Sequence, residues 1–308
     1  MSLAFIFPGQ GSQSVGMLNN LAENFNEVST TFAEASEVLG FDLWSLVSEG
    51  PTEKLNQTDI TQPAMLASAV ATWRIWLAKN GTMPSVVAGH SLGEYTALVC
   101  AGSLDFADAI NLVSQRGKFM MEAVPAGVGA MAAILGMDDD AVRQVCADAA
   151  EGDVLEAVNY NSPGQVVVAG HKTAIERVTA LAKERGAKRA LELPVSVPSH
   201  CALMQPAADK LAEVLAGINF NNPQIPVINN ADVATPGSAD DIRDALKRQL
   251  YSPVRWVETI EKMAAEGVTQ VIECGPGKVL VGLNKRIDKT MNTAALVDAD
   301  SVDAALNL

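Results

Sequence analysis

Residues 89–93 read Gly-His-Ser-Leu-Gly, which matches the pattern G-x-S-x-G of a serine on a sharp strand-to-helix turn. The apolar run Val86–Ala88 precedes this pattern, and the helix-prone run Glu94–Cys100 follows it. The two glycines leave space for the turn, which lifts the hydroxyl out of the sheet at the positively polarised start of the helix. The pattern predicts acyl transfer with Ser91 as the nucleophile; a glycine-rich turn around an inert serine is the alternative.

A serine nucleophile needs a general base, and the chain has three histidines, at 90, 171 and 200. The side chain of His90 should diverge from its neighbour Ser91, and His171 is interpreted as a loop residue. His200 lies just ahead of a predicted helix and is therefore the candidate base; a solvated loop histidine is the alternative. An α/β-hydrolase would place its histidine close to the C-terminus. Because residues 201–308 follow His200, the order favours a Ser–His pair on a related but distinct scaffold.

Arg116 is a charged residue on the apolar face of the helix predicted for residues 106–124. A guanidinium that faces the interior without a partner costs on the order of several kcal/mol, so we expect a fixed carboxylate beside it. The planar fork of arginine suits a bidentate pair with that carboxylate, which is either structural or part of a substrate. If Ser91 is an acyl nucleophile, Arg116 would select an acyl group that ends in a second carboxylate, such as malonyl.

The loop at residues 8–13, Pro-Gly-Gln-Gly-Ser-Gln, is only superficially similar to a phosphate-binding loop. It lacks the Gly-Lys-Ser/Thr ending and the glycine spacing of nucleotide-binding motifs, so both interpretations fail. What remains is a turn with exposed amides. The backbone N–H of Gln10 could form an oxyanion hole with that of Leu92, and each such donor typically contributes about 10²–10³ in rate. A plain tight turn is the alternative.

The composition excludes several classes of protein. The net charge of −14 argues against binding to nucleic acids or anionic membranes, which gain from a basic surface. No run of about 18 apolar residues is present, and the start of the chain does not match a signal peptide, so we expect a cytoplasmic protein. The four cysteines are widely scattered without a C-x-x-C pair, which predicts buried free thiols and neither zinc nor disulfides.

Most of the chain alternates between strand-like and helix-like segments, which predicts a hydrolase-like α/β fold with a mostly parallel sheet covered by helices. With 308 residues, 48% of them hydrophobic, the chain can bury a large core. The expected strands are 3–7, 85–88, 225–228, 269–274 and 293–297, and the expected helices are 27–39, 64–77, 92–101, 106–124, 202–215, 239–250 and 254–265.

Residues 126–196 follow a different order, β-α-β-β-α-β, which is typical of a ferredoxin-like unit. We therefore expect a small inserted domain at 126–196 and a large catalytic domain formed by 1–125 and 197–308. The junction between two such domains is a common place for a ligand. The expected small-domain strands are 129–135, 154–158, 165–169 and 188–193, with helices at 138–149 and 172–185 and a hairpin turn at 161–164.

Several motifs, which follow one another along the chain from residue 7 to residue 277, resemble in type and order those of the malonyl-CoA:acyl carrier protein transacylases of bacterial fatty acid synthesis. The resemblance implies that Ser91 is the nucleophile, that His200 is the base, and that Arg116 pairs with the malonyl carboxylate. It also implies an oxyanion hole formed by the amides of Gln10 and Leu92. The motifs lie at residues 7–13, 61–64, 89–95, 115–117, 161–165, 198–200 and 273–277.

Two further residues enter through the resemblance alone. A backbone carbonyl orients the histidine in this family, and the matching position is Gln249. Met120, one helical turn beyond Arg116, would line the acyl pocket, although a methionine on an apolar face usually fills the core. The implied reaction is a ping-pong exchange between malonyl-CoA and acyl carrier protein, with no metal or redox cofactor.

Acyl carrier proteins are acidic, so a chain of this charge needs a local basic surface to dock one. The candidates are Lys188 with Arg189 and Lys285 with Arg286; ordinary solvated charges are the alternative. Two other functions stay open. A serine esterase or thioesterase would use the same pair but would want a neutral acyl pocket, whereas a silent acyl-binding domain would have no need for Ser91, His200 and Arg116 together.

Overall fold

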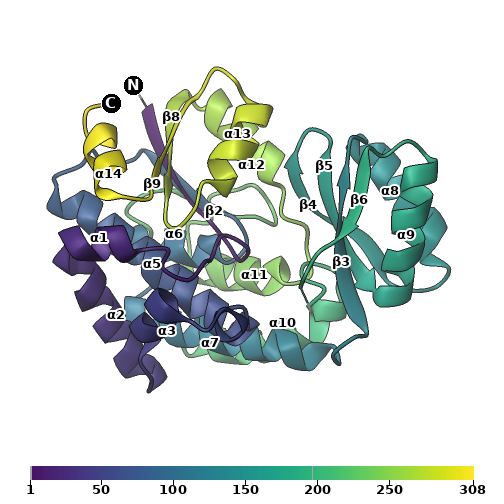
Figure 1. The fold of residues 1–308 in the computed structure, drawn as a ribbon, viewed down its shortest axis with the longest axis horizontal. Coiled ribbons are helices and arrows are strands. Elements are labelled where there is room, and N and C mark those ends of the chain that lie inside the picture. The colour runs from purple at the N-terminus through teal and green to yellow at the C-terminus, as the bar shows by residue number, and fades with distance from the viewer. Residues whose placement is uncertain (1, 196) are drawn as a thin grey trace.

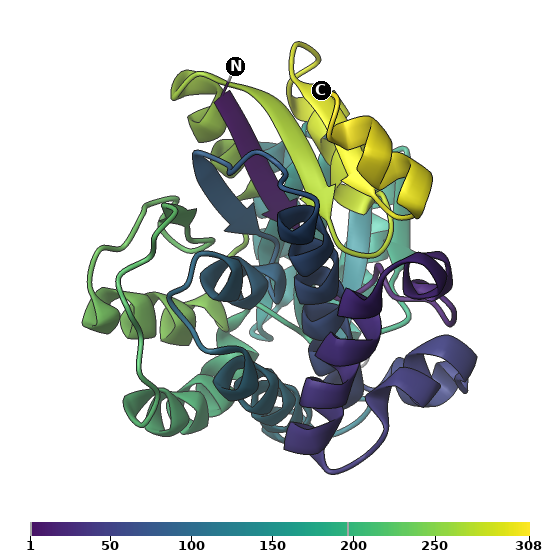
Figure 2. The same cartoon turned by 90° about the vertical axis from the view of Figure 1, so that its left-hand side faces the viewer.

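The chain forms two β-sheets, each with its own helices (Figure 1), in a computed structural model that describes residues 2–195 and 197–308. The larger sheet is parallel throughout, with the strand order β7-β2-β1-β8-β9. Both views place the two chain termini beside each other at one end of this sheet (Figure 2). Its strands are β1 (Ser2–Phe7), β2 (Val86–Gly89), β7 (Val227–Ile228), β8 (Val268–Cys274) and β9 (Asn292–Leu296).

The central strand β1 shows why this sheet lies inside the molecule. Successive side chains of a strand point to opposite faces. Phe5 and Phe7 belong to the hydrophobic core on one face, and Ala4 and Ile6 belong to the core on the other. Because both faces are covered, the strand is a continuous apolar run, as is usual in a parallel sheet. The helices of this lobe are α1 (Asn19–Asn24), α2 (Asn26–Leu39), α3 (Leu43–Glu49), α4 (Thr52–Leu55), α5 (Thr58–Ala78), α6 (Gly93–Cys100), α7 (Phe106–Ala123), α10 (Gln205–Ala216), α11 (Ala239–Gln249), α12 (Trp256–Ala265), α13 (Val279–Ile287) and α14 (Ala299–Ala305).

The smaller sheet is antiparallel in the order β4-β5-β3-β6, which is the ferredoxin-like arrangement of a β-α-β-β-α-β chain. One face packs on its own two helices. The other face contributes Met131, Val158 and Val167 to a cluster with Cys201, which belongs to the segment returning to the large lobe. The elements are β3 (Gly129–Leu135), α8 (Asp139–Ala150), β4 (Leu155–Ser162), β5 (Gln165–His171), α9 (Lys172–Glu184) and β6 (Arg189–Glu192).

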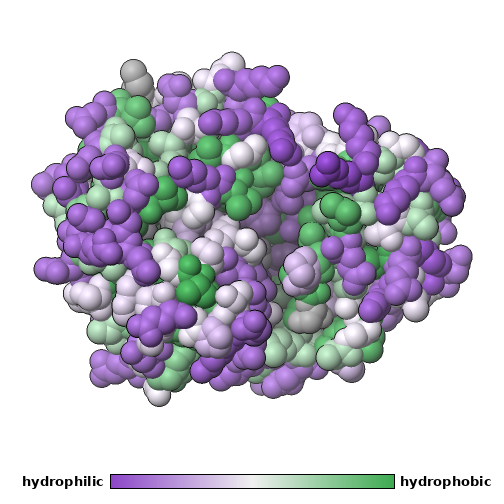
Figure 3. All heavy atoms as spheres, in the orientation of Figure 1, coloured by the Kyte–Doolittle hydropathy of each residue, from purple (hydrophilic) through white to green (hydrophobic). Residues whose placement is uncertain are grey.

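Backbone hydrogen bonds join the two lobes. Val254, just ahead of α12, donates its N–H to the carbonyl of Val158 at 2.8 Å and accepts from the N–H of Tyr160 at 3.0 Å. The segment before α12 therefore lies against β4 like a further parallel strand. Figure 3, which has the orientation of Figure 1, shows that the surface is hollowed between the two lobes.

The predicted α/β class with its inserted β-α-β-β-α-β unit is confirmed, and the differences are local. Helix α5 begins at Thr58 instead of residue 64 and contains Pro63, because nearly all of its first half is buried and packing outweighs the proline. Strand β4 continues to Ser162, so the hairpin turn is only Pro163–Gly164. The short helices α1, α3, α4, α13 and α14 were not predicted from the sequence. Among the helices in the described ranges, none has the length and apolar character needed to cross a bilayer.

Candidate active site

Ser91 lies on the turn between β2 and α6, at the carboxyl end of the parallel sheet. Its φ is 52°, in the left-handed region that residues with a side chain rarely adopt. The turn is tight enough to require both glycines: a Cβ on Gly89 would lie 1.8 Å from the carbonyl carbon of Gly93, and one on Gly93 would lie 2.1 Å from the carbonyl oxygen of Phe7. The strained serine is held by its N–H, which donates to Oδ1 of Asn230 at 2.7 Å. The turn therefore presents the hydroxyl in one fixed direction.

His200 meets this hydroxyl from the segment that returns from the small lobe. Its Nε2 lies 2.7 Å from Ser91 Oγ, and its Nδ1 lies 2.8 Å from the backbone carbonyl oxygen of Gln249. A carbonyl can only accept, so Nδ1 carries the proton and Nε2 is free to accept the serine proton. The backbone of His200 is also left-handed, with φ 69°, and its N–H donates to the carbonyl of Leu250. The expected base is thus in hydrogen-bonding contact with the expected nucleophile.

The environment keeps the imidazole neutral. The pKa of His200 is lowered from its ordinary 6.5 to about 3. Burial is the largest cause, and the positive charge of Arg116 is the next. A neutral imidazole is the form that acts as a general base. Because the folded pKa lies below the ordinary one, the stability that this neutral group contributes is lost as the pH falls from 6.5 towards 3.

Arg116 is buried beside the pair without the structural carboxylate that was one of the two expectations. In the described residues, no Asp or Glu oxygen lies within 4.0 Å of its guanidinium. Its partners are amide oxygens: Nη1 donates to Gln62 Oε1 at 2.8 Å, and Nη2 donates to Gln249 Oε1 at 3.1 Å. Nη2 also lies 3.4 Å from Ser91 Oγ, and Nε has no hydrogen-bond partner among the described residues. The guanidinium is therefore desolvated, unneutralised and adjacent to the hydroxyl.

The expected oxyanion donors line the same cavity of about 110 Å³. Gln10 follows β1 and Leu92 follows Ser91, so the loops of two adjacent strands meet at one edge of the sheet. Neither backbone amide donates a hydrogen bond to another described residue. The cavity is lined by Gln10, His90, Ser91, Leu92, Arg116, Met120, Met131, Asn159, Leu193, Val195, Val197, Ser199 and His200.

Met120 lines the cavity and is also buried, with its Sδ 3.5 Å from Nε2 of Gln62. The site thus contains a glutamine that the sequence analysis did not single out, although it belongs to the motif at 61–64. Asn230 and Glu94 were missed too. Glu94 lies within the motif at 89–95, whereas Asn230 lies in a loop that carries no sequence signal.

The other two histidines lie elsewhere. His90 turns away from Ser91, as expected, and its Nε2 lies 2.8 Å from Oδ1 of Asn161 on the small lobe. Burial lowers the pKa of His90, which favours the neutral ring. His171 is the last residue of β5 and not a loop residue, and its Nδ1 accepts from the N–H of Val154. Within the described ranges, no three His, Cys, Asp or Glu side chains gather as metal ligands would.

Comparison with known proteins identifies relatives along the whole chain. The family described as "Acyl transferase domain" matches residues 4–301. Malonyl CoA-acyl carrier protein transacylase of Escherichia coli (strain K12) is 60% identical over 305 residues, which cover 99% of both chains. The crystal structure of an acyl carrier protein S-malonyltransferase from Vibrio cholerae matches with a TM-score of 0.97 and 62% identity over 99% of each chain. A malonyl-transacylase, solved in complex with its type II polyketide acyl-carrier protein, matches with a TM-score of 0.99 and 58% identity. The match covers 100% of this chain and 99% of that one.

The low pKa of His200 leads to a direct titration test. In protein carrying ¹³C-labelled histidine, the imidazole signal of His200 should stay that of the neutral ring from pH 8 down to pH 5, because burial and Arg116 both oppose protonation. His200→Gln identifies the signal by its loss. A His200 titration with a midpoint near 6.5 would contradict the electrostatic account of the base.

Proposed function

Because this chain belongs to the malonyl-CoA:acyl carrier protein transacylases of the acyl transferase family, we propose how its residues transfer malonyl from coenzyme A to acyl carrier protein. One observation carries the assignment of roles: Ser91 Oγ lies 2.7 Å from His200 Nε2 and 3.4 Å from a buried guanidinium that has no carboxylate partner among the described residues. A nucleophile, a base and an unneutralised cation therefore converge on one small cavity.

In the first half-reaction, Nε2 of His200 accepts the proton of Ser91 while Oγ attacks the thioester carbonyl of malonyl-CoA. The negative charge that develops on the carbonyl oxygen is stabilised by the backbone amides of Gln10 and Leu92. The carbon–sulfur bond then breaks, and the protonated His200 returns its proton to the sulfur of coenzyme A. A malonyl ester of Ser91 remains.

The second half-reaction reverses these steps with another thiol. The phosphopantetheine thiol of acyl carrier protein gives its proton to His200, and the sulfur attacks the ester carbonyl. Collapse of the intermediate breaks the ester bond, and Ser91 recovers its proton from His200. The two halves balance without electron transfer, so the scheme invokes no redox cofactor.

Three residues adapt the site to its substrate. Arg116 pairs with the free carboxylate of the malonyl group, since its partners in the structure are only neutral amide and hydroxyl oxygens. Met120 forms part of the wall beside the acyl group. The backbone carbonyl of Gln249 fixes the ring of His200 and its tautomer.

We propose that the carrier docks on two basic pairs beside the cleft. Arg286 of α13 donates to Oε1 of Gln165 on β5, so α13 reaches across to the small lobe. Gln165 pairs with Leu135 of β3, which in turn pairs with Arg189 of β6. The pair at 285–286 thus contacts β5, which only β3 separates from β6 and the pair at 188–189. None of the four cations forms an ion pair within the described residues.

We also propose the division into a catalytic domain of residues 1–125 and 197–308 and a small domain of residues 126–196, although residue 196 itself lies outside the described ranges. The support is that each sheet packs on its own hydrophobic core.

We place the enzyme in the cytoplasm, where the four free and buried cysteines would stay reduced.

The acyl-enzyme and its selectivity provide the first test. Mass spectrometry of the Ser91 peptide should show a malonyl increment after malonyl-CoA, none after acetyl-CoA, and discharge by acyl carrier protein. Arg116→Ala should lower kcat/KM for malonyl-CoA on the order of 100-fold, the equivalent of about 3 kcal/mol for charge-assisted hydrogen bonds. Lys118→Ala, an exposed cation on the same helix, is the control and should change little. Free coenzyme A without an adduct would instead indicate a thioesterase.

The docking surface is tested by charge reversal. Lys188→Glu/Arg189→Glu and Lys285→Glu/Arg286→Glu should each raise the KM for acyl carrier protein about tenfold, because an acidic partner then meets like charge. Transfer to a small thiol should be unchanged. The matched control is Lys172→Glu/Lys183→Glu, which changes two exposed cations of α9. An unchanged carrier KM in both test variants would remove this surface from consideration.

Native-state hydrogen exchange in increasing urea tests the domain division. Amides of β3 and β5 should converge on one unfolding isotherm and those of β1 and β8 on another, because the two sheets have separate cores. A single isotherm shared by both sets would mean that the chain unfolds as one unit.

A further inference from the structure

The mechanism makes no use of Glu94, a buried carboxylate in the first turn of α6. It is 2% exposed and forms no ion pair with a described residue. Burial raises its pKa to about 7. Its Oε2 accepts two hydrogen bonds, from the backbone N–H of Asn230 at 2.9 Å and from Nε2 of Gln249 at 2.8 Å. A buried carboxylate with only neutral donors is costly, so its position calls for an explanation.

Gln249 connects this carboxylate to the reacting groups. Its Nε2 also donates to the backbone carbonyl of Ser91 at 3.0 Å, and its Oε1 accepts from Arg116. An amide has one accepting end and one donating end. Because Glu94 and the Ser91 carbonyl both require a donor, the NH₂ faces them, and the oxygen must face the guanidinium.

The same amide separates two opposite charges. The positive charge of Arg116 opposes the rise in the pKa of Glu94, yet their side chains lie beyond ion-pair distance with the Gln249 amide between them. If the amide turned over, its NH₂ would face the guanidinium, and two donors would oppose each other. The orientation of Gln249 thus decides whether Arg116 stays in place with its charge unneutralised.

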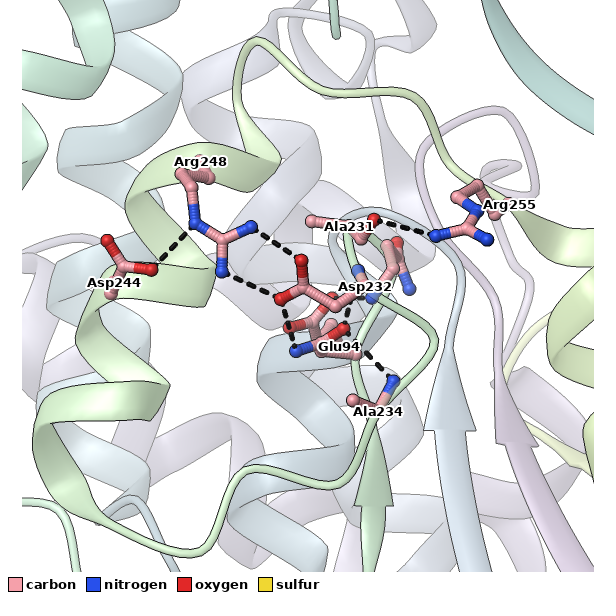
Figure 4. Close-up of polar contacts among 9 residues, drawn as sticks. Glu94, Ala231, Asp232, Ala234, Asp244, Arg248 and Arg255 are labelled. Carbon is pink, nitrogen blue, oxygen red and sulfur yellow. Dashed lines mark hydrogen bonds and ion pairs between the residues drawn. The ribbon is translucent and has the colours of Figure 1, made fainter.

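The two segments that carry the donors to Glu94, the loop after β7 and the end of α11, contact each other through Arg248 and Asp232 (Figure 4). Asn230 lies in the loop after β7, where Asp232 receives two hydrogen bonds of 2.7 Å from Arg248. Arg248 directly precedes Gln249 at the end of α11 and also bonds Asp244. These contacts join the loop to the helix end, and Glu94, which accepts from both, connects them to the helix following Ser91.

We propose that Glu94 is a positioning residue for selectivity towards malonyl groups: by holding Asn230 and Gln249, it keeps Arg116 in place and without a carboxylate partner until the acyl carboxylate binds. The inference rests on the proposed function, since it assigns a task to Arg116 in that reaction. Glu94 itself touches neither the substrate nor the reacting atoms.

The readout is the ratio of kcat/KM for malonyl-CoA to that for acetyl-CoA. Glu94→Gln keeps an accepting oxygen for both donors, so the ratio should stay within about threefold of wild type. Glu94→Leu removes the acceptor and should lower the ratio at least tenfold. Glu94→Asp retains a carboxylate but withdraws it by about one carbon–carbon bond, so it should also lower the ratio. This variant provides the test if the leucine variant does not fold.

Two controls separate positioning from simple loss of stability. Glu273→Leu replaces another fully buried carboxylate, which accepts from the backbone of α13 away from the cavity, and should lower Tm without changing the ratio. In an Arg116→Ala background, the Glu94→Leu change should have little further effect on the ratio, because Glu94 affects selectivity through Arg116.

An unchanged ratio in a folded Glu94→Leu or Glu94→Asp variant would overturn the inference, as would an equal loss in the presence and absence of Arg116. A Glu94→Gln variant as unselective as Glu94→Leu would also overturn it, because the acceptor would then not be what matters. Failure of the proposed function is a separate outcome: wild-type protein would then form no malonyl ester on Ser91.

Discussion

The burial of a guanidinium without a carboxylate beside it is the constraint on which the rest of this site depends. Removing such a charge from water is costly, and proteins usually offset the cost with an ion pair. Here Arg116 meets the amide oxygens of Gln62 and Gln249 and the ring of Tyr95, whose centroid is 5.3 Å from Cζ. Dipoles and a ring solvate the cation but leave its full charge in place. A ligand carboxylate therefore finds a partner whose dehydration has already occurred during folding.

The proposed nucleophile and the proposed base both lie at strained backbone positions. Ser91 and His200 both have positive φ, and each is held by more than one contact from another part of the chain. Asn230 receives the Ser91 N–H on its side chain and donates to the carbonyl of Gly89, so it spans the whole turn. Such over-determined geometry fixes the distance between Oγ and Nε2 before any substrate arrives, which is what positional catalysis requires.

The fold class and the residues proposed to react could be predicted from the sequence, because they depend on local pattern. The turn at Ser91 follows from glycine spacing, and elimination among three histidines led to His200. Gln249 came only through family resemblance, since its contribution to His200 is a backbone carbonyl and any residue type would supply one. Asn230 and the role of Glu94 could not be predicted, because they depend on how a loop after β7 packs against α6 and α11. Propensity also misplaced the start of α5, where burial overrides Pro63.

The backbone pairing between Val254 and β4 has a consequence for how substrates are told apart. Two main-chain hydrogen bonds join β4 of the small lobe to the segment before α12 of the large lobe, and they restrain movement between the two walls of the cleft. We therefore expect acetyl and malonyl groups to meet the same walls. In the proposed reaction, the difference between them is then the single electrostatic contact with Arg116, so the acyl group would be selected inside the cleft and the carrier protein at the proposed basic pairs on its rim.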